Sequence, residues 1–257
     1  MMLMAGKCHS QPIQLGVMPL LKPELISRQL TPIKEGLDSK GLAIDLVFPR
    51  TREEFAAYCK AGKITVAYAG AGYASLLVNH FGFIPVLTSD QIIKLVLFSK
   101  KNTRYHPGMK NTANKVFYAK ENLLALFEAQ KMLGESNDQL IIKSTADHVI
   151  YTVLEQERSA GIVLRAQLGL LNEVFKDDIY VHKSKPVGRL YVLLAPQLKA
   201  QKDMIQKQFL NFHDSWKSTN KKYFYLNHFS FKKWQASDQA ELEISDQFQT
   251  FLKDLQY

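Results

Sequence analysis

The sequence has little cysteine and lacks the spacing that metal sites need. Its 257 residues include two cysteines, Cys8 and Cys59. Neither lies in a C-x-x-C pair or in a cluster of cysteine and histidine, which argues against a structural zinc site. Cys59 falls in a predicted helix, where it is interpreted as a small packing residue. We therefore expect neither a metal nor another cofactor.

Familiar catalytic motifs are also missing. The sequence contains no G-x-S-x-G, no H-E-x-x-H and no motif of paired carboxylates. The glycine-rich stretch AYAGAG has the G-x-G spacing but lacks the third glycine of the dinucleotide fingerprint, and no Gly-Lys-Ser/Thr follows it. Glu53 and Glu54 are interpreted as part of a solvated helix face. We expect a protein that is not an enzyme.

Long apolar runs and blocks of charge are absent too. No run of about 18 apolar residues appears, so a membrane-spanning helix is not expected. The formal net charge is +9, but the lysines are scattered and form only short pairs. A scattered excess of positive charge generally serves solubility, so we do not expect nucleic acid as a partner.

The N-terminal segment, residues 1–11, has the composition of the end of an export signal. A basic residue and small residues precede Cys8, but the segment is too short to be an intact signal. A lipoprotein signal would have a small residue directly before the cysteine, where this chain has Lys7. We interpret residues 1–11 as a remnant of an export signal and leave them out of the fold.

What the sequence does contain is a regular alternation of strands and helices. Thr51 and Glu54 form a capping box at the start of one helix, and Gly62 follows its end. Alternation of this kind predicts a parallel sheet covered by helices, with ligands bound at the carboxyl ends of the strands. The expected strands are 13–19, 42–48, 64–68, 83–88 and 92–99, and the expected helices are 23–39, 51–62 and 73–82.

A second alternation follows a polar loop at 103–114. It repeats the β-α-β-α-β order of the first, on the other side of 92–103. For the helix at 147–158, Asp147 is the favoured N-cap and Thr145 the alternative. The expected strands are 115–119, 139–143, 160–164, 178–182 and 189–194, and the expected helices are 121–134, 147–158, 197–218 and 242–255. An aromatic segment at 223–234 is expected to pack on the rest of the protein.

The stretch AYAGAG lies where a strand passes into a helix, and two interpretations remain open. Glycine allows a tight turn and close packing. Alternatively, small residues let an anion reach the unpaired N–H groups at the start of the helix. Because neighbouring strands end at the same edge of the sheet, where ligands bind in such folds, this position favours the second interpretation.

The order of these pieces resembles that of the type 2 periplasmic solute-binding proteins, most closely the phosphate/phosphonate-binding branch of ABC transporters. The resemblance rests on five stretches within about residues 13–217: GVMP, TREEFAAYCKAGKI, AYAGAGYASL, IIKLVLFSKKNT and ADHVIYTVLEQERSAGIVL. The resemblance lies in the order of these stretches rather than in one specific sequence motif.

The resemblance implies an α/β fold of two lobes. Each lobe would be a mostly parallel sheet flanked by helices, and two crossing hinge strands, 95–99 and 190–194, would join them. Lobe one would comprise 12–95 and 189–257, and lobe two 96–188.

The same resemblance implies a set of residues around an inter-lobe cleft. Phosphonate binders usually carry a Ser-Thr-Ser-Gly-like run at the start of the first helix of lobe two, where this chain has Ala119-Lys120-Glu121-Asn122. Lys120 and Arg165 would then supply positive charge. The candidate ligand contacts are Met18, Arg50, Thr51, Tyr68, Gly70, Gly72 and Tyr73 in lobe one, and Lys120, Asn122, His148 and Arg165 in lobe two.

The function that the resemblance implies is capture of a small anionic solute without catalysis. The protein would be a periplasmic monomer that presents the solute to a membrane permease of the ABC type or to a sensor kinase. Three alternatives stay open: an enzyme on the same fold, as in pyrimidine-precursor synthesis, a domain that senses ligand without transport, and the effector domain of a regulator. The lack of a helix-turn-helix segment argues against the last.

Overall fold

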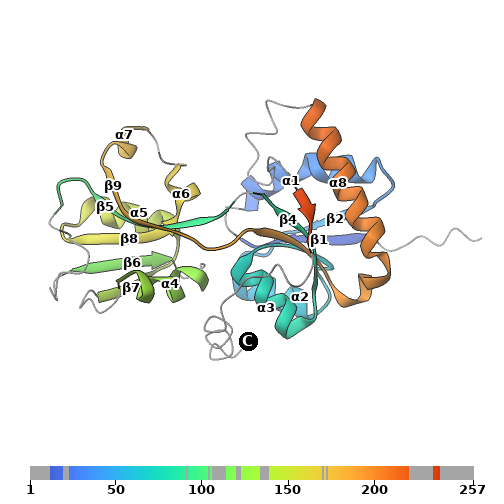
Figure 1. The fold of residues 1–257 in the computed structure, drawn as a ribbon, viewed down its shortest axis with the longest axis horizontal. Coiled ribbons are helices and arrows are strands. Elements are labelled where there is room, and N and C mark those ends of the chain that lie inside the picture. The colour runs from blue at the N-terminus through green and yellow to red at the C-terminus, as the bar shows by residue number, and fades with distance from the viewer. Residues whose placement is uncertain are drawn as a thin grey trace, which may run out of the picture.

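The chain forms two bodies that lie side by side, each built around its own β-sheet (Figure 1). We call them lobe one, around a six-stranded sheet, and lobe two, around a five-stranded sheet. The structure is a computed structural model, which describes residues 12–19, 23–90, 92–103, 105, 114–119, 123–133, 139–169, 171, 173–219 and 234–237. None of the helices in these ranges has the length and apolar character needed to cross a membrane.

The sheet of lobe one has the strand order β11-β4-β10-β3-β1-β2. β1 lies parallel to both β2 and β3, and β10 lies antiparallel between β3 and β4. The strands are β1 (Ile13–Val17), β2 (Ile44–Val47), β3 (Val66–Gly70), β4 (Ile84–Ser89), β10 (Leu190–Leu194) and β11 (Trp234–Ala236).

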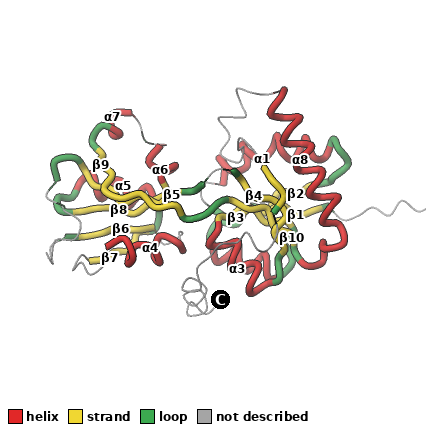
Figure 2. The backbone as a smooth tube through the Cα atoms, in the orientation of Figure 1, coloured by secondary structure: helices red, strands yellow, loops and turns green. Residues whose placement is uncertain are grey.

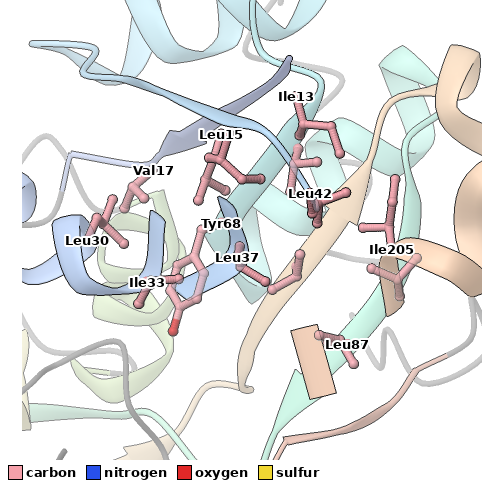
Figure 3. Packing of buried hydrophobic residues seen from close by; sticks show 14 of the residues in the cluster. Ile13, Leu15, Val17, Leu30, Ile33, Leu37, Leu42, Tyr68, Leu87 and Ile205 are labelled. Atoms are coloured by element: carbon pink, nitrogen blue, oxygen red, sulfur yellow. The ribbon is translucent and has the colours of Figure 1, made fainter. Parts of the chain in front are cut away.

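Two layers of helices cover this sheet. Leu15, Val17 and Tyr68 share one face of the sheet with α1 (Pro23–Asp38) and α8 (Lys202–Thr219), as Figure 3 shows for part of this cluster. Ala67 and Ala69 alternate to the other face, where α2 (Arg52–Lys60) and α3 (Ala71–Phe81) pack. The 3₁₀ helix η1 (Pro196–Gln201) leads into α8.

The sheet of lobe two has the order β7-β6-β8-β5-β9. β6 lies parallel to β7 and β8, while β5 lies antiparallel between β8 and β9. α4 packs on one face and α5 on the other. The elements are β5 (Lys94–Lys100), β6 (Lys115–Ala119), α4 (Leu123–Leu133), β7 (Gln139–Lys143), α5 (Ala146–Glu155), β8 (Ser159–Leu164), α6 (Arg165–Gly169), α7 (Glu173–Lys176) and β9 (Ile179–Pro186).

Both sheets follow one plan, in which an antiparallel strand is inserted before the last strand of the alternation. In each lobe that inserted strand, β5 in lobe two and β10 in lobe one, is the first strand that the chain forms after crossing from the other lobe (Figure 2). The crossing segments are tied together, since Ile93 N donates to Gly188 O at 2.7 Å and Val187 N donates to Ile93 O at 2.9 Å. The predicted two-lobed α/β fold is confirmed, with two sheets that are mixed rather than mostly parallel, and the lobe boundaries stay a prediction.

Several elements differ from the expectation. β3 ends at Gly70, two residues later than predicted, so that strand passes into helix without a loop. The N-cap of α5 is Thr145, whose side chain accepts from His148 N, so the prediction of Asp147 was wrong. β11, α6 and α7 were not predicted. The predicted helix at 242–255 and residues 1–11 lie outside the described residues, as does most of 103–114 and of 223–234.

Candidate functional site

The junction of β3 and α3 lies at the carboxyl end of the parallel strands of lobe one. Gly70 is the N-cap of α3 and has no side chain with which to cap the helix. By contrast, α2 and α5 begin with threonine caps, at Thr51 and Thr145. The first-turn N–H groups of α3 therefore lack the side-chain acceptor that the other two helices have, and a helix start of this kind favours a negative charge.

Packing does not require a glycine at position 70. Its φ of −71° is ordinary for any residue, and a Cβ there would lie 3.8 Å or more from its nearest neighbours, Leu190, Ile93 and Met18. Gly188, in the crossing segment beside α3, is different. Its φ is +109°, and a Cβ would approach Ala71 Cβ to 2.5 Å. Gly188 is needed by the backbone, while Gly70 leaves room beside the start of α3.

The start of α2 lies at the end of β2 and carries the predicted capping box. Glu54 N donates to Thr51 Oγ1 at 3.1 Å, and the Glu54 carboxylate accepts from Arg50 N at 2.6 Å and from Tyr58 Oη at 2.6 Å. These hydrogen bonds, that from Tyr58 first, lower the pKa of Glu54. Arg50 itself is exposed, in the loop before the cap.

Arg52, the first residue of α2, connects the two lobes electrostatically. Its Nε lies 2.8 Å from Glu53 Oε1, and its side chain is 21% exposed. Burial raises the pKa of Tyr118, at the end of β6 in lobe two, and the positive charge of Arg52 opposes that rise. The start of α2 thus lies near the carboxyl end of β6.

The other predicted residues of lobe one are buried. Met18 belongs to the cluster beneath α2 and α3. The ring of Tyr73 packs edge-on against Phe55, with 6.0 Å between ring centroids. The ring of Tyr68 lies in the opposite cluster, beside Ile33 and Leu37 in Figure 3, and burial raises its pKa well above the usual value. Met18 and Tyr73 adjoin the start of α3, whereas Tyr68 points to the other side of the sheet.

In lobe two, the strand ends on either side of β6 carry the remaining predicted residues. His148, exposed in the first turn of α5, lies with Nδ1 2.6 Å from Ser144 Oγ. Arg165 is exposed at the first position of α6, directly after β8. Lys143 Nζ, at the end of β7, lies 4.8 Å from the centroid of the Phe117 ring. Lys120 and Asn122 lie outside the described residues.

This region carries charges of both signs, with the acidic residues Glu53, Glu54 and Asp147 in the first turns of α2 and α5. Arg52 faces lobe two from lobe one, and Lys143 and Arg165 end the strands that flank β6. Glu53 offsets part of the charge of Arg52, and the guanidinium in turn lowers the pKa of Glu53, against the effect of desolvation. No group of three or more histidine, cysteine or acidic side chains suited to a metal occurs among the described residues. The guanidinium and ammonium groups here are of a kind that binds anions.

Sequence reasoning missed Arg52, Tyr118, Ser144 and Thr145 as members of this region. It named Arg50, which precedes the N-cap, and did not name Arg52, which follows it. The capping box itself held the signal, because a residue one position after the N-cap lies on the first turn of the helix, while a residue before the cap lies in the loop. For Tyr118 no signal existed, since its place depends on how the two lobes meet.

Comparisons with known proteins identify the fold. No family model matches the sequence, and no curated protein matches it. Among solved structures, the binding-protein component of an ABC phosphonate transporter from Pseudomonas aeruginosa is 12% identical, with a TM-score of 0.73 over 95% of this chain and 87% of that one. PhnD1 of Prochlorococcus marinus, solved with methylphosphonate, is 12% identical, with a TM-score of 0.70 over 94% and 98%.

A third similar structure is a histidine kinase sensor domain that itself resembles periplasmic binding proteins. It is 12% identical, with a TM-score of 0.56 over 82% of this chain and 92% of that one. At such identities the likeness establishes the fold. This chain has the two-lobed fold of the type 2 periplasmic binding proteins, as its sequence resemblance predicted.

Proposed function

We propose that the protein is a non-catalytic solute-binding protein of the periplasm. It captures a small anion, of phosphate or phosphonate type, between its two lobes. Its fold is shared with phosphonate-binding proteins over nearly its full length, and the positive side chains at the facing strand ends suit an anionic guest. The observation that carries the proposal is Gly70, because neither backbone strain nor packing calls for a glycine at the uncapped start of α3.

In this proposal each lobe supplies some of the groups that contact the ligand. Lobe one offers the first-turn N–H groups of α3 and the guanidinium of Arg52, which can hold two oxygens of an oxyanion at once. Lobe two offers Ser144, His148 and Arg165, together with the predicted contacts Lys120 and Asn122. Tyr118, near the end of β6, is buried in the core of lobe two. Met18, Arg50, Thr51, Gly72 and Tyr73 stay predicted contacts.

Two kinds of membrane partner suit this fold. An ABC permease would accept the solute for transport, and a sensor kinase would respond to its capture. The likeness to a kinase sensor domain favours sensing as the second candidate function, but that likeness covers less of this chain than the likeness to the phosphonate-binding proteins does. We propose a monomer that presents its solute to a permease.

A thermal-shift screen tests the proposal. A ligand that binds the native state alone raises the melting temperature as its concentration exceeds Kd. The purified protein is screened with phosphate, phosphite, methylphosphonate, sulfate and small carboxylates, each with sodium chloride at matched ionic strength. We expect phosphorus oxyanions to raise Tm and chloride to leave it unchanged. Equal shifts with all salts, or no shift with any, would refute capture of such a solute.

A further inference from the structure

Helix α3 of lobe one is buried on all sides over two turns. All eight residues from Ala71 to Val78 are buried, including the two that carry a hydroxyl group, Tyr73 and Ser75. A helix on the surface of a lobe normally keeps a polar face, so one that is apolar all round needs cover on more than one side. The sheet and α2 cover part of α3 within lobe one. α4 of lobe two also contacts it.

Helix α4 presents different faces to the two lobes. Ala125, Ala129 and Met132 pack in the core of lobe two. Phe127 instead packs against the cluster of lobe one that contains α3. Lys131, one turn further along, holds its ammonium group 4.2 Å from the centroid of the Phe127 ring. A single aromatic side chain thus makes an apolar contact between the lobes.

An ion pair and a hydrogen bond join the side of α4 next to Phe127 to β9. Glu128, buried among these elements, forms an ion pair with Lys185, and Lys183 donates to the carbonyl of Met132 near the end of α4. β9 continues directly into the crossing segment. Phe127 therefore belongs to a helix of lobe two that is bound to the strand leading into the crossing segment.

We propose that Phe127 is a latch that holds the two lobes together in the absence of any solute. When the lobes separate, the Phe127 ring and the face of α3 that it covers become exposed to water, which disfavours the open form. The resting state is then closed, and a solute or a partner acts on a contact that already exists. This latch goes beyond the proposed capture of an anion and does not depend on it.

Small-angle X-ray scattering of the solute-free protein tests the latch. The variants are Phe127→Ala and, as a matched control, Tyr151→Ala. Tyr151 is a half-exposed aromatic residue of α5, where it contacts Phe175 of lobe two. We expect the wild type to scatter as the arrangement of Figure 1, in which α4 of lobe two contacts α3 of lobe one. Phe127→Ala should shift to a larger radius of gyration, and Tyr151→Ala should not.

Two results would overturn the proposal: a wild type whose scattering fits only separated lobes, or a Phe127→Ala variant with the radius of gyration of the wild type. Far-UV circular dichroism and thermal melting establish that each variant is folded. If the alanine variant does not fold, Phe127→Gln serves instead, because it keeps much of the volume while replacing the apolar surface with a polar one. Neither measurement uses a solute, so the outcome is independent of the thermal-shift screen.

Discussion

Gly188 and Gly70 lie on either side of the start of α3, and their surroundings make opposite predictions for the same substitution. Gly188→Ala places a side chain at a φ of +109° and within 2.5 Å of Ala71 Cβ. We expect it to lower the free energy of unfolding by about 1–3 kcal/mol, the usual range for strain of this kind. Gly70→Ala, with an ordinary φ and only ordinary van der Waals contacts around its Cβ, should leave the stability nearly unchanged. Urea denaturation of both variants measures the difference, and equal losses would contradict it.

Arg52 carries a prediction about solute binding. Arg52→Gln removes the guanidinium but keeps a side chain that can form part of the helix start. A hydrogen bond to a charged group contributes about 1.5–3 kcal/mol, so we expect the affinity for a phosphorus oxyanion to fall by about tenfold or more. The control is Arg28→Gln, an exposed arginine of α1. Calorimetric titration compares the two, and similar losses in both would mean that only overall charge matters.

For single residues, local sequence patterns predicted helix caps and turns well, but they did not predict which part of the protein each side chain faces. It identified glycine at the start of α3 and the threonine cap of α2 from local patterns, which depend on neighbours in the chain. It could not distinguish a side chain that faces the other lobe from one that faces the core. Tyr68 and Ala69 are adjacent, yet a shift of one residue along a strand moves a side chain to the opposite face of the sheet.

The capping box of α2 makes a prediction at the scale of an element. The pKa of Glu54 is lowered from its ordinary value of 4.5 by hydrogen bonds that form in the folded protein. Its contribution to stability is therefore present above pH 4.5 and is lost as the pH falls through the lowered value. We expect Glu54→Gln to be less stable than the wild type at pH 7 and nearly as stable at pH 3. Thermal melts at both values test this, and a gap that persists at pH 3 would contradict it.

Most elements of regular structure were predictable from the sequence because their signals are local. Strands β6 and β7 begin and end at the predicted residues, and both are short apolar runs bounded by polar segments. The misses have physical reasons. α6 and α7 are too short for helical periodicity to show, and β11 is a three-residue strand that exists only by pairing with β4. Thr145 precedes Asp147 by two residues, and either residue type makes a good N-cap.

At the scale of the whole molecule, hydrophobic periodicity in the sequence could not predict the order of the strands in the sheets. An alternation of strands and helices predicts parallel neighbours, but it does not reveal that β10, which follows all of lobe two in the chain, enters the sheet of lobe one between β3 and β4. Only the resemblance to a two-lobed family implied such crossing strands. The facing strand ends, and with them the candidate site, depend on this long-range pairing.

The crossing strands also predict how the lobes depend on each other. All five strands of lobe two lie in one continuous stretch, whereas lobe one needs β10 from beyond it. We expect residues 92–187, expressed alone, to fold. Residues 12–90 alone should not, because without β10 the strands β3 and β4 have no hydrogen-bonded link and the sheet divides in two.

Circular dichroism and the dispersion of amide NMR signals test both fragments. A folded 12–90 fragment would show that β10 is dispensable to lobe one, and an unfolded 92–187 fragment would show that lobe two depends on its contact with α3. This difference between the lobes follows from topology. The chain forms all strands of lobe two in one stretch, and lobe one is complete only when β10 joins its sheet afterwards.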